Sequence, residues 1–380
     1  MLSLEPSIKR GLTFWDRALL SPDEFDERVR LVREDMRRRG LAAIVIAGNM
    51  YEDEDLVFLV GYNVDGVFVL PAQGEPAIFT NSGSRESFFL RELTWVSDLS
   101  HRGAQTGAAV AETLRSCGVT SGRIGVAGLQ VLAVQPYNDL VRNLAAYQIE
   151  DFTPGYRALR QKLRPRERAA MRVAFGMADA AAIAAEKIYA AGASNASAVI
   201  EAERVARRVG AWDVRILSNL DGDELRPFER LSDERRDPFL MWVATRYQGY
   251  WAARAVNVPA DPKSEAARAV AAMSAAARPG APAGEIAAAG LVCLSEASRR
   301  TALAYGLGGC IGLAMDAPPL IRPDSREVLA RGMTLLLHVF AEGGDRPSLA
   351  GAMIEIGANG AQTVDAIPAS LPPITATVCA

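Results

Sequence analysis

The chain has 380 residues, of which 49% are apolar and 23% are charged, and its formal net charge is -3. This composition is typical of a globular protein long enough for two domains of ordinary size. The near-neutral charge balance and the absence of an apolar run long enough to cross a bilayer exclude two classes of partner, so we expect neither nucleic acid nor a membrane.

Few side chains are available for metal or disulfide chemistry. The chain has two histidines, His101 and His338, and four cysteines without a CxxC pair. Sites that need several imidazoles, zinc clusters and disulfide frameworks are therefore not indicated. The first residues contain no apolar core of signal-peptide length, so we expect a cytoplasmic protein with reduced cysteines.

The first part of the chain alternates helix and strand patterns. Residues 21–40 predict an amphipathic helix with a capping-box spacing at Ser21 and Glu24 and a stop at Gly40. Two apolar runs follow, LAAIVIAG and DLVFLVGY, and then a hairpin pattern over GVFVLPAQGEPAIFT. Further elements are predicted in chain order: a helix over 106–117, a strand at RIGVAG and a helix over 136–146.

The second part of the chain separates helices from strands. Helices are predicted over 165–191, 195–209, 263–277 and 283–304. Two strand pairs are predicted, one in FLMWVATRYQGYWAARAVNV with its turn at RYQG, the other joining GMTLLLHVFAE to GAMIEIGANGAQTV. We therefore expect an α+β chain with an α/β domain at 1–157 and a second, α+β domain at 158–380.

Residues 305–319, YGLGGCIGLAMDAPP, raise the question of what their glycines approach. A dinucleotide fingerprint needs a third glycine at its sixth position, which is Ile311 when counted from Gly306. No Lys-Ser or Lys-Thr follows either, so a phosphate loop is not indicated.

Several short stretches occur in an order that one family shares. They are FLVGY, LRPRERAAMRVAFGMADAA, YQGY, ARPGAPAGEI, GGCIGL with DAPP, RGMTLLLH and GAMIEIGANG. With these the chain resembles the creatinase, aminopeptidase P and prolidase family over most of its length. The resemblance implies an α/β N-terminal domain, a C-terminal pita-bread domain, and a homodimer in which the partner's N-terminal domain borders the active site.

The resemblance does not extend to the family's metal ligands. In metal-dependent members, five residues bind two divalent metals. The first aspartate falls on Trp242, the second on Ala253, the histidine on Gly309 and the first glutamate on His338, and only the last glutamate is kept, as Glu355. One carboxylate and one imidazole cannot hold a dinuclear centre, so we predict no metal and no other cofactor.

Strand parity suggests which side chains face the former metal pocket. Period two places His338 on one face with Leu336 and Phe340, and Glu355 on one face with Met353 of the next strand. If the fold is as the resemblance implies, the imidazole and the carboxylate become neighbours. The carboxylate would then raise the pKa of the imidazole and make it a general base. The alternative is a core histidine whose ring nitrogens are satisfied by Glu355.

Five further residues are candidates for the site. Asp316, at the position of the family's substrate-side histidine, is either an amine anchor or acid/base group, or a solvated loop carboxylate. Trp242 either fills the vacated metal volume or forms a wall for an apolar or cationic small molecule. Tyr250, Cys310 and Arg254 lie in pocket-forming segments and could bind substrate. Cys310 fits a packing residue better than a nucleophile, and Arg254, on the opposite strand face, fits an ion pair.

Two functions remain open. The first is a metal-independent, creatinase-like hydrolase or lyase that acts on a C–N or related bond of a small amino-acid-derived molecule, with His338, Glu355 and Asp316 as catalytic residues. The second is an inactive pseudo-peptidase that uses the pocket or the dimer surface for binding. An enzyme should retain a partly polar cavity around His338 and Glu355, whereas in a scaffold Trp242 could fill it.

Overall fold

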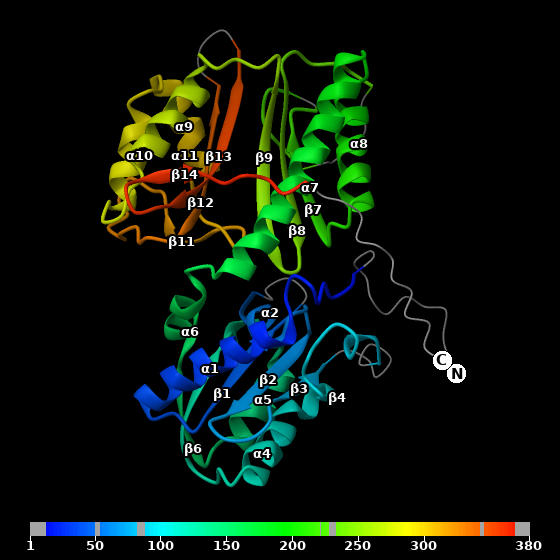
Figure 1. The fold of residues 1–380 in the computed structure, drawn as a ribbon, viewed down its shortest axis with the longest axis vertical. Coiled ribbons are helices and arrows are strands. Elements are labelled where there is room, and N and C mark those ends of the chain that lie inside the picture. Colours follow the sequence, from blue (N-terminus) through cyan, green and yellow to red (C-terminus); the bar gives the residue numbers. More distant parts are fainter. Residues whose placement is uncertain are drawn as a thin grey trace. The chain divides into compact units, whose positions relative to one another are not determined.

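The computed structural model describes residues 13–49, 54–81, 88–220, 222–227, 233–342 and 346–368 (Figure 1). The chain divides into two compact units, Met1–Lys162 and Leu163–Ala380. Helices and sheets occur in both, which confirms the predicted α+β class. None of the described helices is long and apolar enough to span a membrane.

The first unit is built on one mixed sheet of six strands in the order β4-β3-β2-β1-β5-β6. The strands are β1 (Ala43–Gly48), β2 (Gly66–Pro71), β3 (Ala77–Thr80), β4 (Asp98–His101), β5 (Gly122–Ala127) and β6 (Tyr147–Asp151). The helices are α1 (Pro22–Arg39), α2 (Glu54–Val60), α4 (Thr106–Ser116), α5 (Val134–Asn143) and α6 (Thr153–Arg160), with short 3-10 turns η1 (Gly103–Gln105) and η2 (Leu129–Val131). The predicted hairpin is the antiparallel pair β2 and β3, and the second apolar run forms helix α2.

Helix α1 confirms the amphipathic pattern but not the predicted cap. Its apolar positions are buried, and it ends at Gly40, whose left-handed φ of 68° suits glycine. The Ser21 side chain makes no capping hydrogen bond, and its hydroxyl is buried without a partner among the described residues. Glu24, the other residue of the predicted capping box, accepts a hydrogen bond from Arg28 Nε at 3.2 Å, one turn further along the helix.

Both faces of the first sheet are covered. In Figure 1, α1 crosses one face while α4 and α5 lie behind the other. The side chains of one core cluster come from alternate strand positions, such as Val45 and Val69, and from Val110 and Leu114 of α4. This alternation is what a sheet buried on both sides requires, because successive side chains point to opposite faces.

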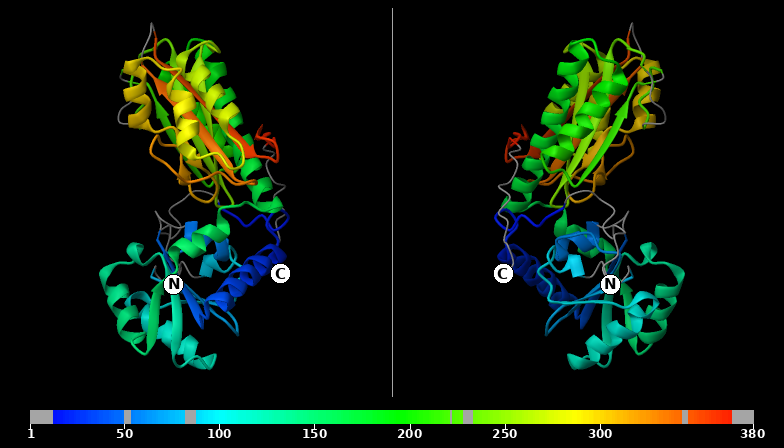
Figure 2. Two further views of the ribbon diagram at one scale, coloured as in Figure 1. Left: turned by 90° about the vertical axis from the view of Figure 1, so that its left-hand side faces the viewer. Right: turned by 90° about the vertical axis from the view of Figure 1, so that its right-hand side faces the viewer.

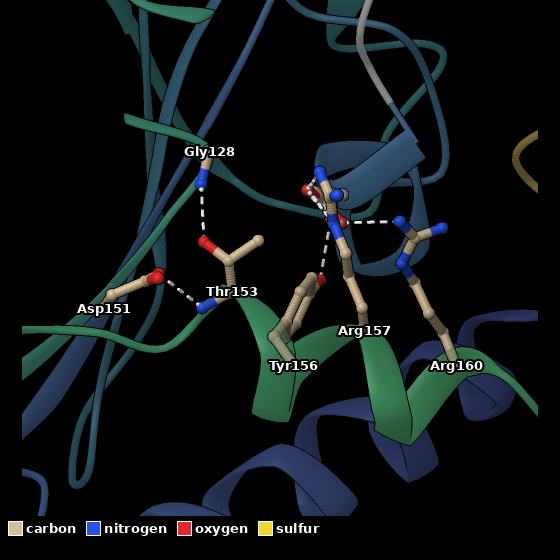
Figure 3. Close-up of polar contacts among 7 residues, drawn as sticks. Gly128, Asp151, Thr153, Tyr156, Arg157 and Arg160 are labelled. Carbon is tan, nitrogen blue, oxygen red and sulfur yellow. Dashed lines mark hydrogen bonds and ion pairs between the residues drawn. The ribbon is translucent and has the colours of Figure 1, made fainter. Parts of the chain in front are cut away.

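Helix α6 is fastened to the start of α2 by one buried carboxylate (Figure 3). Asp55 is 6% exposed, and its two oxygens each lie 2.7 Å from a guanidinium nitrogen, one of Arg157 and one of Arg160. The Tyr156 hydroxyl donates to the backbone carbonyl of Asp55 at 2.7 Å. These contacts tie α6 to the first unit, which ends after Lys162, five residues later than the expected boundary at residue 157.

The second unit contains two sheets. One has the order β7-β8-β9 and the other the order β11-β10-β12-β13-β14. The strands are β7 (Asp213–Ser218), β8 (Phe239–Tyr247), β9 (Tyr250–Val258), β10 (Gly308–Cys310), β11 (Ala317–Leu320), β12 (Thr334–Ala341), β13 (Ser348–Ile356) and β14 (Ala361–Thr363). The helices are α7 (Pro165–Ala190), α8 (Asn195–Arg208), α9 (Glu265–Ala276), α10 (Ala283–Leu291) and α11 (Glu296–Tyr305).

Helices cover the outer face of each sheet in the second unit. Helix α7 packs on β8 and β9, and α9 packs on β12 and β13, so the two sheets lie between two helical layers (Figure 2). Both predicted strand pairs form, and the turn between β8 and β9 uses left-handed φ values of 49° at Gln248 and 88° at Gly249. The predicted helix over 283–304 is two helices, because Ser295 starts α11 by accepting a hydrogen bond from the Ser298 amide.

The Asp55 cluster leads to a stability prediction. Replacing Asp55 by Asn removes the charge that two guanidinium groups share, and the nearly buried Arg160, 9% exposed, loses its paired carboxylate. We expect the free energy of unfolding to fall by about 3 kcal/mol in chemical denaturation. The matched control is Asp98→Asn, an exposed carboxylate on β4, which should change stability by less than about 0.5 kcal/mol. Equal effects of the two substitutions would contradict this role for Asp55.

Candidate functional site

A cavity of about 270 Å³ opens within the second unit between strands β7, β8, β10, β12 and β13. Its described lining is mostly apolar: Leu217, Leu225, Trp242, Tyr305, Met315, Leu336, Phe340 and Leu349. The backbone of Gly308 and Gly309 forms one wall, and the polar side chains of the lining include Asp316 and His338. The cavity is therefore concave and apolar with a few polar groups, which is typical of a small-molecule site.

His338 projects from β12 into this cavity, as its strand parity predicts. Its Nε2 atom lies 3.4 Å from the carbonyl oxygen of Tyr305, and the Trp242 ring meets the imidazole edge-on, with the ring centroids 6.5 Å apart. Its Nδ1 atom is buried and has no hydrogen-bond partner among the residues that the structure describes. Burial lowers the pKa of His338, and the Tyr305 carbonyl and the Asp316 charge offset this only in part. The imidazole is therefore neutral near pH 7.

The predicted pair of His338 and Glu355 does not form. In the antiparallel register of β12 and β13, His338 lies opposite Gly351, and Glu355 lies opposite Thr334, four residues away along β12. At about 3.3 Å per residue the separation along the strand is roughly 13 Å. Both the expected acid/base pair with its raised pKa and the alternative of a histidine satisfied by Glu355 are therefore wrong. Strand parity predicted correctly which face of β12 carries His338, but it gives no information about the register between β12 and β13.

Glu355 has a different partner. Its carboxylate lies 3.9 Å from Arg168 Nε of α7, and both side chains are about one-third exposed. It does not line the cavity. The carboxylate retained from the family's ligand set is thus part of an ion pair with the helix layer.

Asp316 and Trp242 do reach the cavity. Asp316 is exposed and lies on the segment just before β11, at the edge of the cavity. Trp242 is half-buried and packs against an apolar cluster that contains Leu225, Phe340 and Leu349. Since space remains beside the indole, Trp242 forms a wall of the cavity and does not fill it.

Tyr250, Cys310 and Arg254 do not line the cavity. The Tyr250 hydroxyl donates to Glu167 Oε1 at 2.6 Å, and both residues are fully buried. Cys310 packs in the core beneath the helices, where burial raises the pKa of its thiol to about 12, so it is not a thiolate. Arg254 lies with Nε 3.4 Å from Asp179 Oδ1, the ion pair expected for it. Substrate binding by these three residues has no support in the structure.

The glycine-rich segment approaches neighbouring strands. Gly308 has a left-handed φ of 104°, and a Cβ at this position would lie 1.9 Å from the Leu336 carbonyl oxygen. A Cβ at Gly309 would lie 2.8 Å from Leu320 Cδ2. These glycines let β10 pass close to β12 and β11, and a side chain at Gly309, the position of the family's histidine ligand, would have to displace the end of the Leu320 side chain.

The residues present do not fit a dinuclear metal centre. Two of the five ligand positions are apolar, Trp242 and Ala253, and a third is Gly309. The remaining two, His338 and Glu355, are separated by the register of β12 and β13. Within the described ranges no group of three or more His, Cys, Asp and Glu side chains could hold a metal ion.

Sequence reasoning missed several lining residues. Leu217, Leu225 and Leu349 come from segments far apart in the chain, and nothing in their local pattern marks them. Tyr305 is different, because it immediately precedes the glycine-rich segment. Its hydroxyl donates a hydrogen bond to the Leu225 carbonyl at 2.9 Å. Its ring packs edge-on against the Phe340 ring, with the ring centroids 4.9 Å apart. A polar aromatic residue beside a glycine cluster was the one available signal.

The lowered pKa of His338 predicts a pH dependence of stability. Because the folded-state pKa lies below the ordinary value, the unfolded state takes up a proton first as the pH falls below about 6.5. Stability is therefore complete above that pH and decreases below it, by up to about 1.4 kcal/mol per pH unit until the folded-state pKa is reached. Urea unfolding of the wild type and His338→Gln between pH 8 and pH 5 should show a smaller decrease in the variant.

The matched control for this experiment is His101→Gln, since His101 is exposed and is the other histidine of the chain. This variant should keep the wild-type pH dependence, because it retains His338. An unchanged pH slope in His338→Gln would show that His338 does not have the lowered pKa.

Solved structures similar to this one come from several functional classes, at identities that show the fold alone. An X-Pro aminopeptidase from Thermotoga maritima has a TM-score of 0.74 at 13% identity, covering 90% of this chain and 98% of its own. A prolidase from Pyrococcus horikoshii has a TM-score of 0.71 at 16% identity, covering 91% and 100%. The N-terminal domain of the FACT complex subunit SPT16 from Cicer arietinum (chickpea) has a TM-score of 0.63 at 15% identity, covering 92% and 97%.

These neighbours confirm the pita-bread fold that the sequence resemblance implies. No curated protein matches the chain. The model of metallopeptidase family M24 matches residues 169–365, more than half of the 380 residues. The chain therefore belongs to metallopeptidase family M24, as a divergent member without the family's metal ligands.

Proposed function

We propose that the cavity beside His338 binds a small, largely apolar molecule, and that this binding has replaced metal-dependent hydrolysis. The observation that carries the proposal is an imidazole with an unpartnered buried nitrogen in a mostly apolar cavity, at a position where metal-dependent members have a ligand. A buried polar atom without a partner costs about 1–3 kcal/mol. Such a cost is commonly found at functional sites, where strain is tolerated because the group is used.

The size of the cavity limits the ligand. An apolar cavity of about 150 Å³ in another protein takes up benzene. The present cavity, about 270 Å³, accommodates an apolar body of one or two rings. Its walls are aromatic on several sides, with Trp242, Tyr305 and Phe340, so a flat ring system has favourable partners.

The remaining polar groups support binding better than hydrolysis. Hydrolysis through two metals needs several carboxylates converging on one point, whereas Glu355 is paired with Arg168 and lies outside the cavity. A cysteine nucleophile needs a thiolate, which the raised pKa of Cys310 opposes. The proposal thus corresponds to the inactive pseudo-peptidase that uses its pocket.

A metal-independent hydrolase or lyase is the second candidate. The observation that favours it is the position of Asp316, which lines the same cavity as His338 and whose charge acts on the imidazole. A neutral imidazole near pH 7 is a competent general base. In this candidate His338 removes a proton from the reacting group, and Asp316 stabilises the resulting imidazolium. Glu355 takes no part. Turnover of a bound molecule that is lost in His338→Gln, while binding persists, would favour it over simple binding.

The first prediction of this proposal concerns metals. The full chain should retain less than 0.1 equivalent of Mn, Co, Fe or Zn in elemental analysis after dialysis against a 1 µM solution of each ion. Calorimetric titration with Mn²⁺ or Co²⁺ should show no stoichiometric binding. Two equivalents of metal per chain would contradict the replacement of the metal centre.

The second prediction concerns the cavity volume. Leu349→Trp adds an indole inside the cavity, and binding of 2-naphthol, measured by calorimetry, should weaken at least tenfold relative to the wild type. The control is Leu303→Trp, at a 47% exposed position of α11, which should bind as the wild type does. Should Leu349→Trp fail to fold, Leu336→Phe tests the same volume. Absence of wild-type binding, or equal binding by all variants, would refute the proposal.

A further inference from the structure

We infer that the ligand of this cavity is a monocationic amine, with an apolar body of one or two rings inside the cavity and its ammonium group at the carboxylate of Asp316. The inference rests on the proposed binding function and specifies the class of molecule bound. The charges, the walls and the polar acceptors of the site support it.

The charge of the cavity lining favours a cationic ligand. Asp316 is the one formally charged side chain among the described residues that line the cavity, and no lysine or arginine accompanies it there. Its carboxylate makes no hydrogen bond or ion pair within the described part of the chain. A ligand that carries one positive charge therefore meets an available carboxylate, and a charge-assisted hydrogen bond is roughly twice as strong as a neutral one.

The uncharged imidazole of His338 is also compatible with a cationic ligand. Its lowered pKa keeps the imidazole uncharged near pH 7, so it does not repel a cation. The carbonyl oxygen of Tyr305, 3.4 Å from Nε2, is an accepting group beside the imidazole. The polar part of the cavity thus offers negative and accepting groups, and no cationic group.

The walls of the cavity suit an apolar ring next to a positive charge. Trp242 packs beside the imidazole, and an indole face also attracts an ammonium group within about 6 Å. The apolar cluster of Leu225, Leu240, Phe340 and Leu349 also packs against Trp242. An apolar ring and an adjacent positive charge are therefore both accommodated, one against the cluster and one towards Asp316.

The same features disfavour anions and zwitterions. A ligand carboxylate inside the cavity would lose water, would find no cation among the described lining residues, and would lie near Asp316. Free amino acids and dipeptides carry such a carboxylate. The site therefore selects amines in which no carboxylate accompanies the ammonium group.

Three probes with a common indole body separate these contributions. Tryptamine is a cation, tryptophol its neutral counterpart and indole-3-propionate an anion. We expect calorimetry on the full chain at pH 7.5 to give a Kd for tryptamine at least tenfold lower than for tryptophol, with indole-3-propionate the weakest. Asp316→Asn should weaken tryptamine at least tenfold and leave tryptophol unchanged. The charge control is Asp324→Asn, an exposed carboxylate in the same unit, which should change neither Kd.

The outcomes distinguish failure of the amine inference from failure of the binding proposal. If tryptophol and tryptamine bind equally to the wild type, or if Asp316→Asn leaves tryptamine unaffected, the amine inference is wrong while the binding proposal stands. If no probe binds, or if Leu349→Trp weakens none of them, the binding proposal fails as well. Circular dichroism of Asp316→Asn confirms that a loss of tryptamine binding is not a loss of fold.

Discussion

The cavity depends on the close approach of two backbones. Because Gly308 has no Cβ, β10 passes within van der Waals contact of the Leu336 carbonyl on β12. This pairing aligns β10 with β12 and exposes backbone, rather than side chains, as one wall of the cavity. A side chain at Gly308 would clash with the backbone of Leu336 and force β10 away from β12. The absence of a side chain at Gly308 therefore permits the close pairing of β10 with β12 that forms this wall of the cavity.

Much of the fold could be predicted from the sequence, because local patterns encode it. Apolar spacing gave α1, and the RYQG turn gave the β8 and β9 pair with its left-handed residues Gln248 and Gly249. A short apolar run such as DLVFLVGY is ambiguous, since burial on all sides suits a helix and a strand equally. The predicted capping box does not form, and the carboxylate of Glu24 pairs with Arg28, one turn further along the same helix. Propensity does not include such pairings.

The candidate site was less predictable, because it depends on register and on distant segments. The sequence placed His338 and Trp242 correctly at the cavity, since strand parity and motif spacing are local properties. It could not give the four-residue offset between His338 and Glu355, which follows from how β13 pairs with β12. Tyr250 was misassigned for a related reason: its hydroxyl bonds to Glu167, a residue 83 positions earlier, and no local pattern reports that contact.

The ion pair between Arg168 and Glu355 has a consequence for the history of the site. A guanidinium held on α7 by the chain itself acts as a covalently tethered competitor for the carboxylate, so its effective concentration far exceeds that of a free ion. A divalent cation at Glu355 would have to compete with this guanidinium. Return to metal chemistry therefore requires new ligands at Trp242 and Ala253, and the new metal would compete with Arg168 for Glu355.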